Sequence, residues 1–488
     1  MAIQTFKWPL ASEFLNREAE LAQLGRWWRE RNRRVVAMYG RRRVGKSWLF
    51  RAFAHEKPAI VLVAEEGARG AQLTKLARAL EEPLGLRPDL ADVPDLFRAL
   101  YRLGREKKTL AVIDEFPHLM PSAQKERREM LTAIQAVIEE EQDSSQTKFI
   151  LCGSQISSME RLLAEESPLH GRLYRFFVSP LGPDECVPFI EADSARDWVE
   201  RFSVSGGMPM YLDELGRGGS LKELLGENVL SHLGILFEEP RYVLQQELRR
   251  PAIYFSILDE IASGPQALRD LSNALGTPST SLTEYLRTLQ EMRIIDRELP
   301  ITSKENSTGY RYRLTDGFFR FWFRFVRPYA SELEAGLKPA DLWTAEVEPA
   351  FPEHIAPAFE VLCRRWVRAN LGSEASRVGS WWGPALNELR AKHERETEEI
   401  DVVGLHRGRV SLVAECKWTS KPISVSLLGE IEKYKLPALA QGGIKIKKGG
   451  PSIVLFSRSG FTDGLKKAAQ ESDRLRLIGI EEVISAED

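Results

Sequence analysis

The chain is 488 residues long, enough for about three domains of roughly 150 residues each. An apolar fraction of 43% and a charged fraction of 28% are ordinary for a globular protein, and a formal net charge of −2 gives no global attraction to a nucleic acid. The 4 cysteines are scattered without a Cys-x-x-Cys pair, and the most apolar stretch, 318–326, is short and carries arginines, which disfavours a disulfide framework, a thiolate zinc site and a membrane span. We expect a soluble, cytoplasmic protein with no membrane partner, in which any polyanion site is a local patch.

The first motif is a glycine-containing turn between an expected strand and an expected helix. Residues 34–39 form a short apolar run that suits a buried parallel strand, and residues 47–53 begin a helical pattern. The sequence between them, Gly40-Arg41-Arg42-Arg43-Val44-Gly45-Lys46-Ser47, has the spacing of a phosphate loop. A strand, this loop and a helix in that order predict a nucleotide-binding α/β domain.

Each key position of the loop has a physical role in binding ATP and Mg²⁺. Gly40 and Gly45 let backbone N–H groups converge on phosphate oxygens. Lys46 is expected to reach the terminal phosphates, and the Ser47 hydroxyl to ligate magnesium at a helix N-terminus that favours anions.

Two further apolar runs end in polar residues. The run 109–113 leads into Asp114-Glu115, where we expect Asp114 to hold magnesium and Glu115 to orient and deprotonate the attacking water. The run 149–153 places Ser154 or Gln155 where a neighbouring strand could sense the terminal phosphate, although an ordinary exit from a strand explains this pattern nearly as well.

These motifs resemble the archaeal-type ATPase family, which lies close to the AAA+ and STAND ATPases. The segments that carry the likeness are 14–21 (FLNREAEL), 39–47, Asp114-Glu115, 152–154 and 168–172 (PLHGR). The resemblance implies that Arg17 lies near the adenine side of the pocket. It also implies that Arg172 faces phosphate, in its own chain or across a contact in a homo-oligomer; the alternative for Arg172 is a surface salt bridge.

We expect a helical lid at 181–248, after an ATPase domain at 1–180, and a winged helix-turn-helix at 249–316. Three amphipathic stretches, 253–263, 267–275 and 281–293, precede an expected hairpin. The third helix can enter the major groove of DNA through four side chains, Thr280, Ser281, Thr283 and Arg287. A protein contact module is the alternative. The aromatic residues that follow favour core packing over base stacking, in an expected linker helix at 317–350.

The last region, 351–488, is expected to be a second α/β domain. After the proline-containing stretch 339–357, a helix is expected at 358–367 and a helix at 427–436, with strands at 378–382, 400–405, 410–416 and 452–456. This order resembles the PD-(D/E)XK, restriction-endonuclease-like fold, and the segments 399–404 and 413–418 match its two core elements.

The chemistry of these segments supports the same hypothesis. Glu415 and Lys417 alternate on one face of a strand, and Asp401 on the preceding strand can complete a magnesium site. Glu360 could add a ligand from the first helix, while Lys417 positions or activates water. The alternative is a simple ion pair on an exposed strand.

Together the motifs predict an ATP-binding, ATP-hydrolysing protein that acts on DNA, duplex rather than RNA, with a nuclease-like domain. Two alternatives stay open: a non-cutting regulatory ATPase with a silent nuclease fold, and a protein-assembly switch without affinity for nucleic acid.

Overall fold

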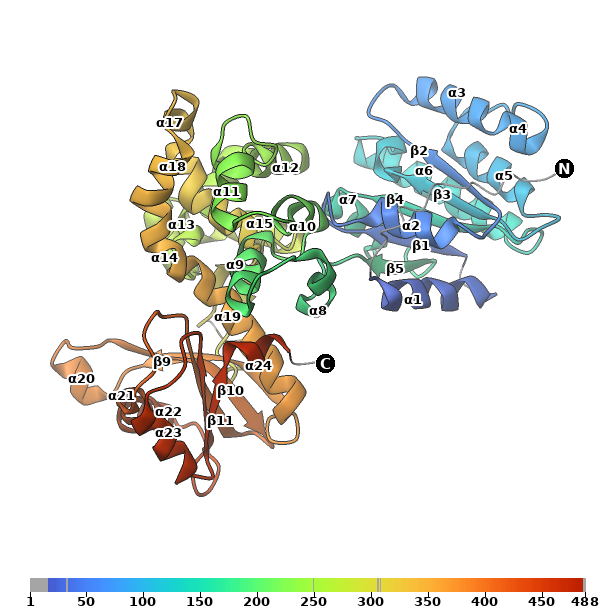
Figure 1. Ribbon diagram of the computed structural model, residues 1–488. Helices are drawn as coiled ribbons and strands as arrows, with labels where there is room; N and C mark the ends of the chain where they lie inside the picture. Colours follow the sequence, from blue (N-terminus) through green and yellow to red (C-terminus); the bar gives the residue numbers. More distant parts are fainter. Residues whose placement is uncertain (1–15, 32–33, 249, 305–306, 308, 486–488) are drawn as a thin grey trace. The chain divides into compact units, whose positions relative to one another are not determined.

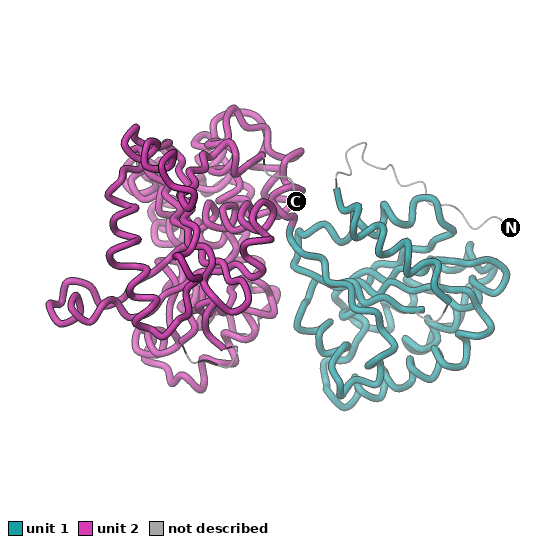
Figure 2. Tube along the Cα trace, turned by 90° about the horizontal axis from the view of Figure 1, so that it is seen from below, with its two compact units in different colours: residues 1–180 teal, residues 181–488 magenta. Residues whose placement is uncertain are grey.

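The computed structural model describes residues 16–31, 34–248, 250–304, 307 and 309–485. Residues 14 and 15 of the first family-like segment therefore lie outside the described part. The chain divides into two compact units, residues 1–180 and 181–488 (Figure 2). The finer subdivision expected at 248, 316 and 350 stays a prediction.

The first unit is built on a five-stranded parallel sheet in the order β2-β3-β4-β1-β5 (Figure 1). The strands are β1 Val35–Tyr39, β2 Ala59–Val63, β3 Leu110–Asp114, β4 Lys148–Gly153 and β5 Leu173–Phe177. The helices are α1 Glu18–Arg29, α2 Lys46–Ala54, α3 Arg69–Ala79, α4 Glu81–Leu84, α5 Val93–Leu103, α6 Gln124–Glu141 and α7 Ile156–Leu163, with a 3-10 turn at Phe116–Leu119. The predicted parallel α/β fold is confirmed for this unit.

Burial explains why the runs at 34–39, 109–113 and 149–153 form strands. Every residue of β1, β3 and β4 is buried. Because successive side chains point to opposite faces, complete burial means that both faces of the sheet are covered by helices. Phe97 of α5, for example, stacks on Phe149 of β4, with ring centroids 5.2 Å apart.

The second unit begins with a group of short helices. They are α8 Pro183–Cys186, a 3-10 turn Val187–Phe189, α9 Ala195–Ser205, α10 Pro209–Leu215, α11 Leu221–Leu225, a π-helical segment Gly226–Leu230 and α12 Glu239–Glu247. Next come three helices, α13 Pro251–Ala262, α14 Leu268–Leu275 and α15 Ser279–Glu291. A three-stranded sheet, ordered β6-β8-β7, completes a winged helix from β6 Gln266–Ala267, β7 Ile295–Glu298 and β8 Arg311–Leu314.

The aromatic segment after the winged helix is core, as predicted. It forms α16 Gly317–Phe321 and a π-helical segment Trp322–Val326, in which Phe318, Phe319 and Trp322 are fully buried. Gly317 is needed there because a Cβ at this position would lie 2.2 Å from the carbonyl oxygen of Ser203. The segment therefore packs α16 closely against α9. Its aromatic rings are buried and are not available to stack with bases.

The structure shows that the helix expected after the proline-containing stretch begins within that stretch. Short elements, namely a 3-10 turn Arg327–Tyr329, α17 Ala330–Glu334, α18 Pro339–Leu342 and a π-helical segment Trp343–Val347, lead directly into α19 Glu348–Leu371. Pro352 and Pro357 lie inside α19, so the helix begins ten residues before the expected 358. The preceding helical turns and the burial of Phe351, Ile355 and Phe359 offset the backbone hydrogen bonds that the two prolines remove.

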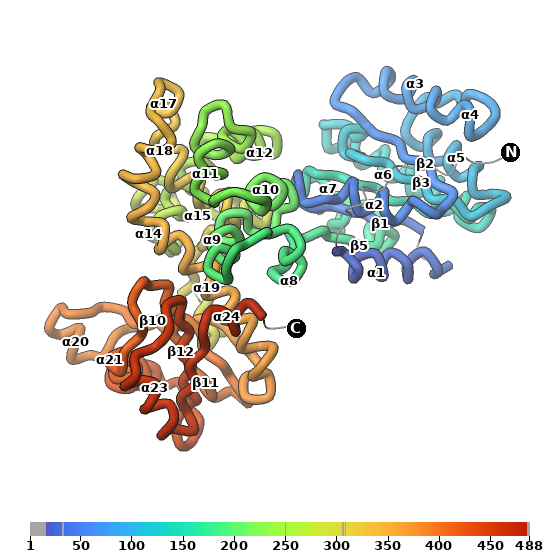
Figure 3. The backbone as a smooth tube through the Cα atoms, in the orientation of Figure 1, coloured from blue at the N-terminus to red at the C-terminus, as the bar shows by residue number. Residues whose placement is uncertain are grey.

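The C-terminal part is a mixed sheet ordered β13-β12-β11-β10-β9, followed along the orange-to-red tube of Figure 3. The strands are β9 Arg377–Pro384, β10 Thr397–His406, β11 Arg409–Lys417, β12 Ser452–Ser457 and β13 Leu475–Gly479. The helices are α20 Asn387–Ala391, α21 Val425–Glu430, a π-helical segment Ile431–Lys435, α22 Leu436–Gln441, α23 Asp463–Gln470 and α24 Ile480–Ile484. β9, β10 and β11 are antiparallel, whereas β11, β12 and β13 are parallel. Among the described residues, no helix is both long and apolar enough to cross a membrane.

His354 gives the second unit a defined response to acid. Its ring is fully buried, lies parallel to Phe351 with centroids 5.8 Å apart, and places Nε2 3.2 Å from the carbonyl oxygen of Ser203. Burial, assisted by the charge of Arg320, holds the pKa of His354 well below its ordinary value. The native state therefore cannot bind a proton that the unfolded chain binds below about pH 6.5.

We predict that the stability of this unit falls as the pH decreases from about 6.5, with His354 contributing a slope of up to about 1.4 kcal/mol per pH unit. His354→Gln should remove this contribution, so its unfolding free energy should depend less steeply on pH. Denaturant unfolding from pH 7 to pH 5 measures the difference. His232→Gln, at an exposed histidine, is the control. Equal slopes for wild type and His354→Gln would contradict the assignment.

Candidate functional site

The phosphate loop connects β1 to α2, and two glycines permit its path. Gly45 has φ 93° in the left-handed region, directly before the first residue of α2. At Gly40 a Cβ would lie 2.3 Å from the carbonyl oxygen of Val178, just beyond β5. Both positions therefore require glycine, and the loop turns as closely as the sequence motif predicts.

Lys46 and Ser47 lie at the centre of this loop. The Lys46 ammonium donates to the carbonyl oxygens of Gly40 and Arg41, each at 2.9 Å, and its side chain is buried. The Ser47 hydroxyl lies 3.3 Å from Oδ2 of Asp114 at the end of β3. The hydroxyl and the carboxylate expected to hold magnesium are therefore adjacent, and the oxygen donors present fit that ion.

Glu115 and Ser154 meet at the same edge of the sheet. Glu115 adopts a left-handed backbone conformation with φ 51°, and its Oε2 accepts a hydrogen bond of 3.2 Å from the backbone N–H of Ser154. The Ser154 hydroxyl is buried and has no hydrogen-bond partner among the described residues. A buried hydroxyl without a partner costs free energy, so this position fits a ligand oxygen such as that of a phosphate.

The two arginines singled out by resemblance lie in different surroundings. Arg17 is buried; its Nη2 donates to the carbonyl oxygens of Val44 at 3.1 Å and Ser179 at 2.7 Å, and its Nη1 bonds Glu20. Arg17 therefore holds the phosphate loop in place through its hydrogen bond to Val44. Its position beside adenine stays a prediction. Arg172 forms a surface ion pair with Glu139 of α6, and its approach to phosphate stays a prediction.

A second group of charged residues forms where β10 and β11 meet. Asp401 accepts a 2.8 Å hydrogen bond from the backbone N–H of Cys416, and Lys417 Nζ lies 2.6 Å from Glu415 Oε2 and 3.6 Å from Asp401 Oδ2. Burial alone would lower the pKa of Lys417, but Asp401 and Glu415 raise it above its ordinary value. Lys417 is therefore held as a cation between two carboxylates.

Lys435 is a member of this group that the sequence did not reveal. Its Nζ lies 2.6 Å from the other carboxylate oxygen of Glu415 and 2.7 Å from the carbonyl oxygen of Glu399. A lysine in the expected helix 427–436 was visible, but its inward direction depends on the π-helical segment Ile431–Lys435. The described residues contain no cluster of three or more carboxylate, imidazole or thiol groups able to hold a metal ion. A magnesium ion here would find Asp401 and Glu415 as donors, with both oxygens of Glu415 already bonded to ammonium groups.

Glu360 on α19 belongs to a different ion-pair network. Its carboxylate lies 3.5 Å from Arg313 of β8 and 3.4 Å from Arg364 of α19. Burial raises the pKa of Glu360 to about 7, with Arg313 opposing the shift and Asp401 adding to it. Glu360 is therefore near enough to Asp401 to feel its charge, while its hydrogen bonds are directed to arginines of the winged helix and α19.

The exposed face of α15 carries the four side chains expected to meet DNA. Thr280, Ser281, Thr283 and Arg287 are all exposed, whereas Leu282, Leu286 and Leu289 are buried beneath them. Arg287 has a loose contact of 3.7 Å with Glu291. The helix thus presents short polar groups, one cation and the exposed carboxylate of Glu284 to the outside.

Comparisons with known proteins agree with the N-terminal site. Residues 14–215 match the family described as an ATPase domain predominantly from Archaea, residues 252–298 match the IclR helix-turn-helix domain, and residues 322–428 match archaeal and bacterial proteins of unknown function. The helix-turn-helix prediction is thereby confirmed. The match at 322–428 tests neither the restriction-endonuclease-like fold nor the metal site, which stay predictions.

Two archaeal relatives and one solved structure are similar to this chain. An uncharacterized protein of Methanocaldococcus jannaschii, MJECL04, is 27% identical over 413 residues, covering 83% of this chain and 87% of its own. An uncharacterized ATP-binding protein of the same organism, MJ0423, is 46% identical over 44 residues, 9% of this chain and 75% of its own. The Walker-type ATPase PABY2304 of Pyrococcus abyssi shares the fold, with a TM-score of 0.50 and 22% identity over 64% of this chain and 96% of its own. Residues 14–215 thus have the P-loop fold and match an ATPase domain predominantly from Archaea, and a match to a helix-turn-helix domain follows in the same chain.

Proposed function

We propose that this protein hydrolyses ATP at the loop Gly40–Ser47 and uses the nucleotide to control its action on duplex DNA. The observation that carries the proposal is the contact between the Ser47 hydroxyl and Asp114, at the sheet edge where Glu115 and Ser154 also lie. Four groups with distinct chemical roles in phosphoryl transfer are thereby brought to one place.

Each side chain has a task in this reaction. Lys46 exchanges its two carbonyl partners for oxygens of the terminal phosphates, and Ser47 and Asp114 hold the magnesium ion, which offsets phosphate charge when bound. Glu115 orients the attacking water and takes its proton. Ser154 donates its otherwise unpaired hydroxyl hydrogen to a phosphate oxygen. Arg17 keeps the loop in position through the Val44 carbonyl.

The DNA part of the proposal is supported by the helix-turn-helix match and by the exposed face of α15. Thr280, Ser281 and Thr283 supply short hydroxyls, and Arg287 supplies a cation that suits a phosphate or a base edge. A net charge of −2 makes such a local surface necessary.

A second activity, magnesium-dependent cleavage of a DNA strand, is favoured by the convergence of Asp401, Glu415 and Lys417. The helix α19, the antiparallel strands β9 to β11 and the parallel strand β12 follow one another in an order that resembles the PD-(D/E)XK fold. In this role Asp401 and Glu415 bind the ion and Lys417 positions the water. The competing function is a silent, DNA-binding domain, favoured by Lys435, whose charge already offsets that of Glu415.

We predict that Lys46→Ala weakens ATP binding by about tenfold or more, because charge-assisted hydrogen bonds to the phosphates are lost. Glu115→Gln should bind ATP as wild type does and hydrolyse it about a hundredfold more slowly, because the base is removed. Lys75→Ala, at an exposed lysine of the same unit, should change neither property. Titration with a fluorescent ATP analogue and phosphate release measure the two effects. Wild-type turnover in Glu115→Gln would remove this residue from the role of base.

For the C-terminal site we predict that Asp401→Asn abolishes magnesium-dependent nicking of plasmid DNA and leaves ATP hydrolysis unchanged, since the two sites belong to separate units. Asp463→Asn, at an exposed carboxylate of the same domain, should cut as wild type does. Nicking that survives Asp401→Asn or resists a chelator would place the activity elsewhere. A wild-type protein that binds DNA without nicking it would favour the silent domain.

A further inference from the structure

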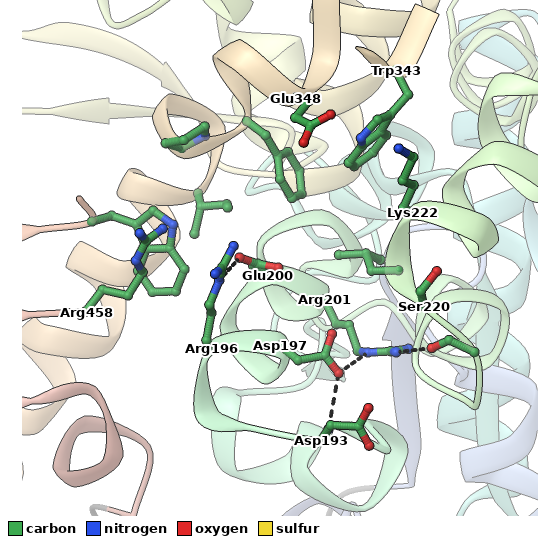
Figure 4. Close-up of a pocket in the computed structure, with 16 residues that line it drawn as sticks. Asp193, Arg196, Asp197, Glu200, Arg201, Ser220, Lys222, Trp343, Glu348 and Arg458 are labelled. Atoms are coloured by element: carbon green, nitrogen blue, oxygen red, sulfur yellow. Dashed lines mark hydrogen bonds and ion pairs between the residues drawn. The ribbon is translucent and has the colours of Figure 1, made fainter. Parts of the chain in front are cut away.

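The second unit contains two large cavities whose charges differ. The first, of about 420 Å³, lies among α9, α11 and α19 (Figure 4). Its charged lining residues are balanced, with four acids, Asp193, Asp197, Glu200 and Glu348, against four bases, Arg196, Arg201, Lys222 and Arg458. Arg196 pairs with Glu200 at 2.7 Å and Arg201 with Asp197 at 2.9 Å. This cavity therefore has no excess of either charge.

The second cavity, of about 550 Å³, is strongly basic. It is lined by β7, β8, α9, α16, α19 and β9. Its charged residues are five arginines, Arg313, Arg320, Arg364, Arg368 and Arg377, and two acids, Asp296 and Glu298. The lining residues alone have an excess of three positive charges, and the carboxylate of Glu360 behind Arg313 and Arg364 offsets part of it.

Among the three arginines on the inner wall of this cavity, Arg313, Arg320 and Arg364, Arg320 differs because its hydrogen bonds go to carbonyl oxygens. Its Nη2 donates to the carbonyl oxygen of His354 at 3.0 Å and its Nη1 to that of Leu314 at 3.4 Å. Its Nε is buried and has no hydrogen-bond partner in the part of the chain that the structure describes. Burial, together with the neighbouring Arg313, lowers the pKa of Arg320 to about 9. The hydrogen-bond partners of Arg320 are neutral carbonyl groups, and the charges of Asp316 and Glu360 oppose the shift only in part, so a bound anion would stabilise the cation further.

The other inner arginines share their carboxylate partners. Glu298 lies 3.3 Å from Arg364 and 3.7 Å from Arg313, and Glu360 bridges the same two arginines. These two guanidinium groups therefore share the same two carboxylates. Arg368 and Arg377 at the exposed rim add two further cations.

We propose that this cavity binds a phosphate group, carried either by a nucleic acid strand or by a free nucleotide. The planar guanidinium fork matches the geometry of phosphate oxygens, and arginine is favoured for this contact. Leu299, Ile301 and Val361 provide an apolar wall beside the arginines, which suits the sugar or base attached to the phosphate. For a strand phosphate the inference rests on the proposed action on DNA; for a free nucleotide it is independent of it.

The test uses the full-length Lys46→Ala protein in EDTA, which weakens binding of the probes at the phosphate loop and removes any metal ion at Asp401. The probes are a 3′-labelled single-stranded tetranucleotide with a 5′-phosphate, the same tetranucleotide without it, and inorganic pyrophosphate as competitor. Fluorescence anisotropy measures the affinities. The variants, added to Lys46→Ala, are the rim pair Arg368→Gln with Arg377→Gln, and Arg320→Gln in the inner wall. Arg409→Gln, at an exposed arginine on the same sheet and outside the cavity, is the matched control.

We expect the rim pair and Arg320→Gln each to weaken binding about tenfold, the value of one charge-assisted hydrogen bond, and Arg409→Gln to leave it unchanged. Equal binding of both tetranucleotides would assign the site to backbone phosphates of a strand. Binding that requires the 5′-phosphate and is displaced by pyrophosphate would assign it to a terminal phosphate. If Arg320→Gln lowers the unfolding temperature, the affinity of the rim-pair variant is the result that tests the proposal, because Arg368 and Arg377 are both exposed.

Absence of saturable binding by every probe, or equal affinity in the rim pair and the Arg409→Gln protein, would overturn the proposal. Arg287→Gln separates this result from the proposed function. It should weaken duplex binding through α15 and leave the affinity for the tetranucleotide unchanged. If the Lys46→Ala protein itself binds the tetranucleotide but not duplex DNA, only the proposed action on duplex DNA is removed.

Discussion

The nucleotide site depends on one close approach, that of Gly40 to the carbonyl oxygen of Val178. No side chain fits between them, since a Cβ would lie 2.3 Å from that oxygen. The approach ties the end of β1 to the exit of β5, where Val178 N–H also donates to the carbonyl oxygen of Tyr39. With the loop pinned in this way, α2 begins at Lys46 and the Ser47 hydroxyl reaches Asp114. Arg17 completes the arrangement by bonding both Val44 and Ser179, one carbonyl on each side of the same contact.

In the second unit, arginines connect the winged helix to the candidate site on β10 and β11. Arg311 of β8 lies 3.6 Å from Glu399, and Arg313 of the same strand lies 3.5 Å from Glu360. Burial is the main reason why the pKa of Glu360 is raised, and the charge of Asp401 adds to the shift. Of these two arginines Arg313 also lines the basic cavity, so an anion bound there would compete with Glu360 for its guanidinium group.

Local patterns predicted much of the first unit and only part of the second. The strands before Gly40, Asp114 and Ser154 were recognisable because each is a short, fully buried apolar run that ends at a chemically distinctive residue. In the C-terminal domain β13 was missed because its pattern, Leu475–Gly479, is only half buried and weakly apolar. The prolines of α19 suggested a break because tertiary packing, which offsets their missing hydrogen bonds, is invisible in sequence.

The site residues, too, were predictable from the sequence where they depend on local patterns and not where they depend on long-range packing. Asp401, Glu415 and Lys417 were predicted together because their strands and alternation are local features. Lys435 and the arginine-lined cavity were not, since they depend on a π-helical turn and on segments more than 150 residues apart, such as Phe202 and Arg377. The role of Arg172 rests on the family likeness alone, and its ion pair with Glu139 at the surface does not test that role.

The central claim is that the nucleotide state and DNA engagement are thermodynamically linked. The most direct test is the affinity of the Glu115→Gln protein for ATP, measured with and without saturating duplex DNA, since this variant is expected to bind ATP without consuming it. Linkage requires that DNA change ATP affinity by the same factor by which ATP changes DNA affinity, and a coupling of roughly 1–3 kcal/mol, or about five- to 150-fold, is typical. The account predicts a shift in this range, measured reciprocally. Identical ATP affinities in the presence and absence of bound DNA would contradict it.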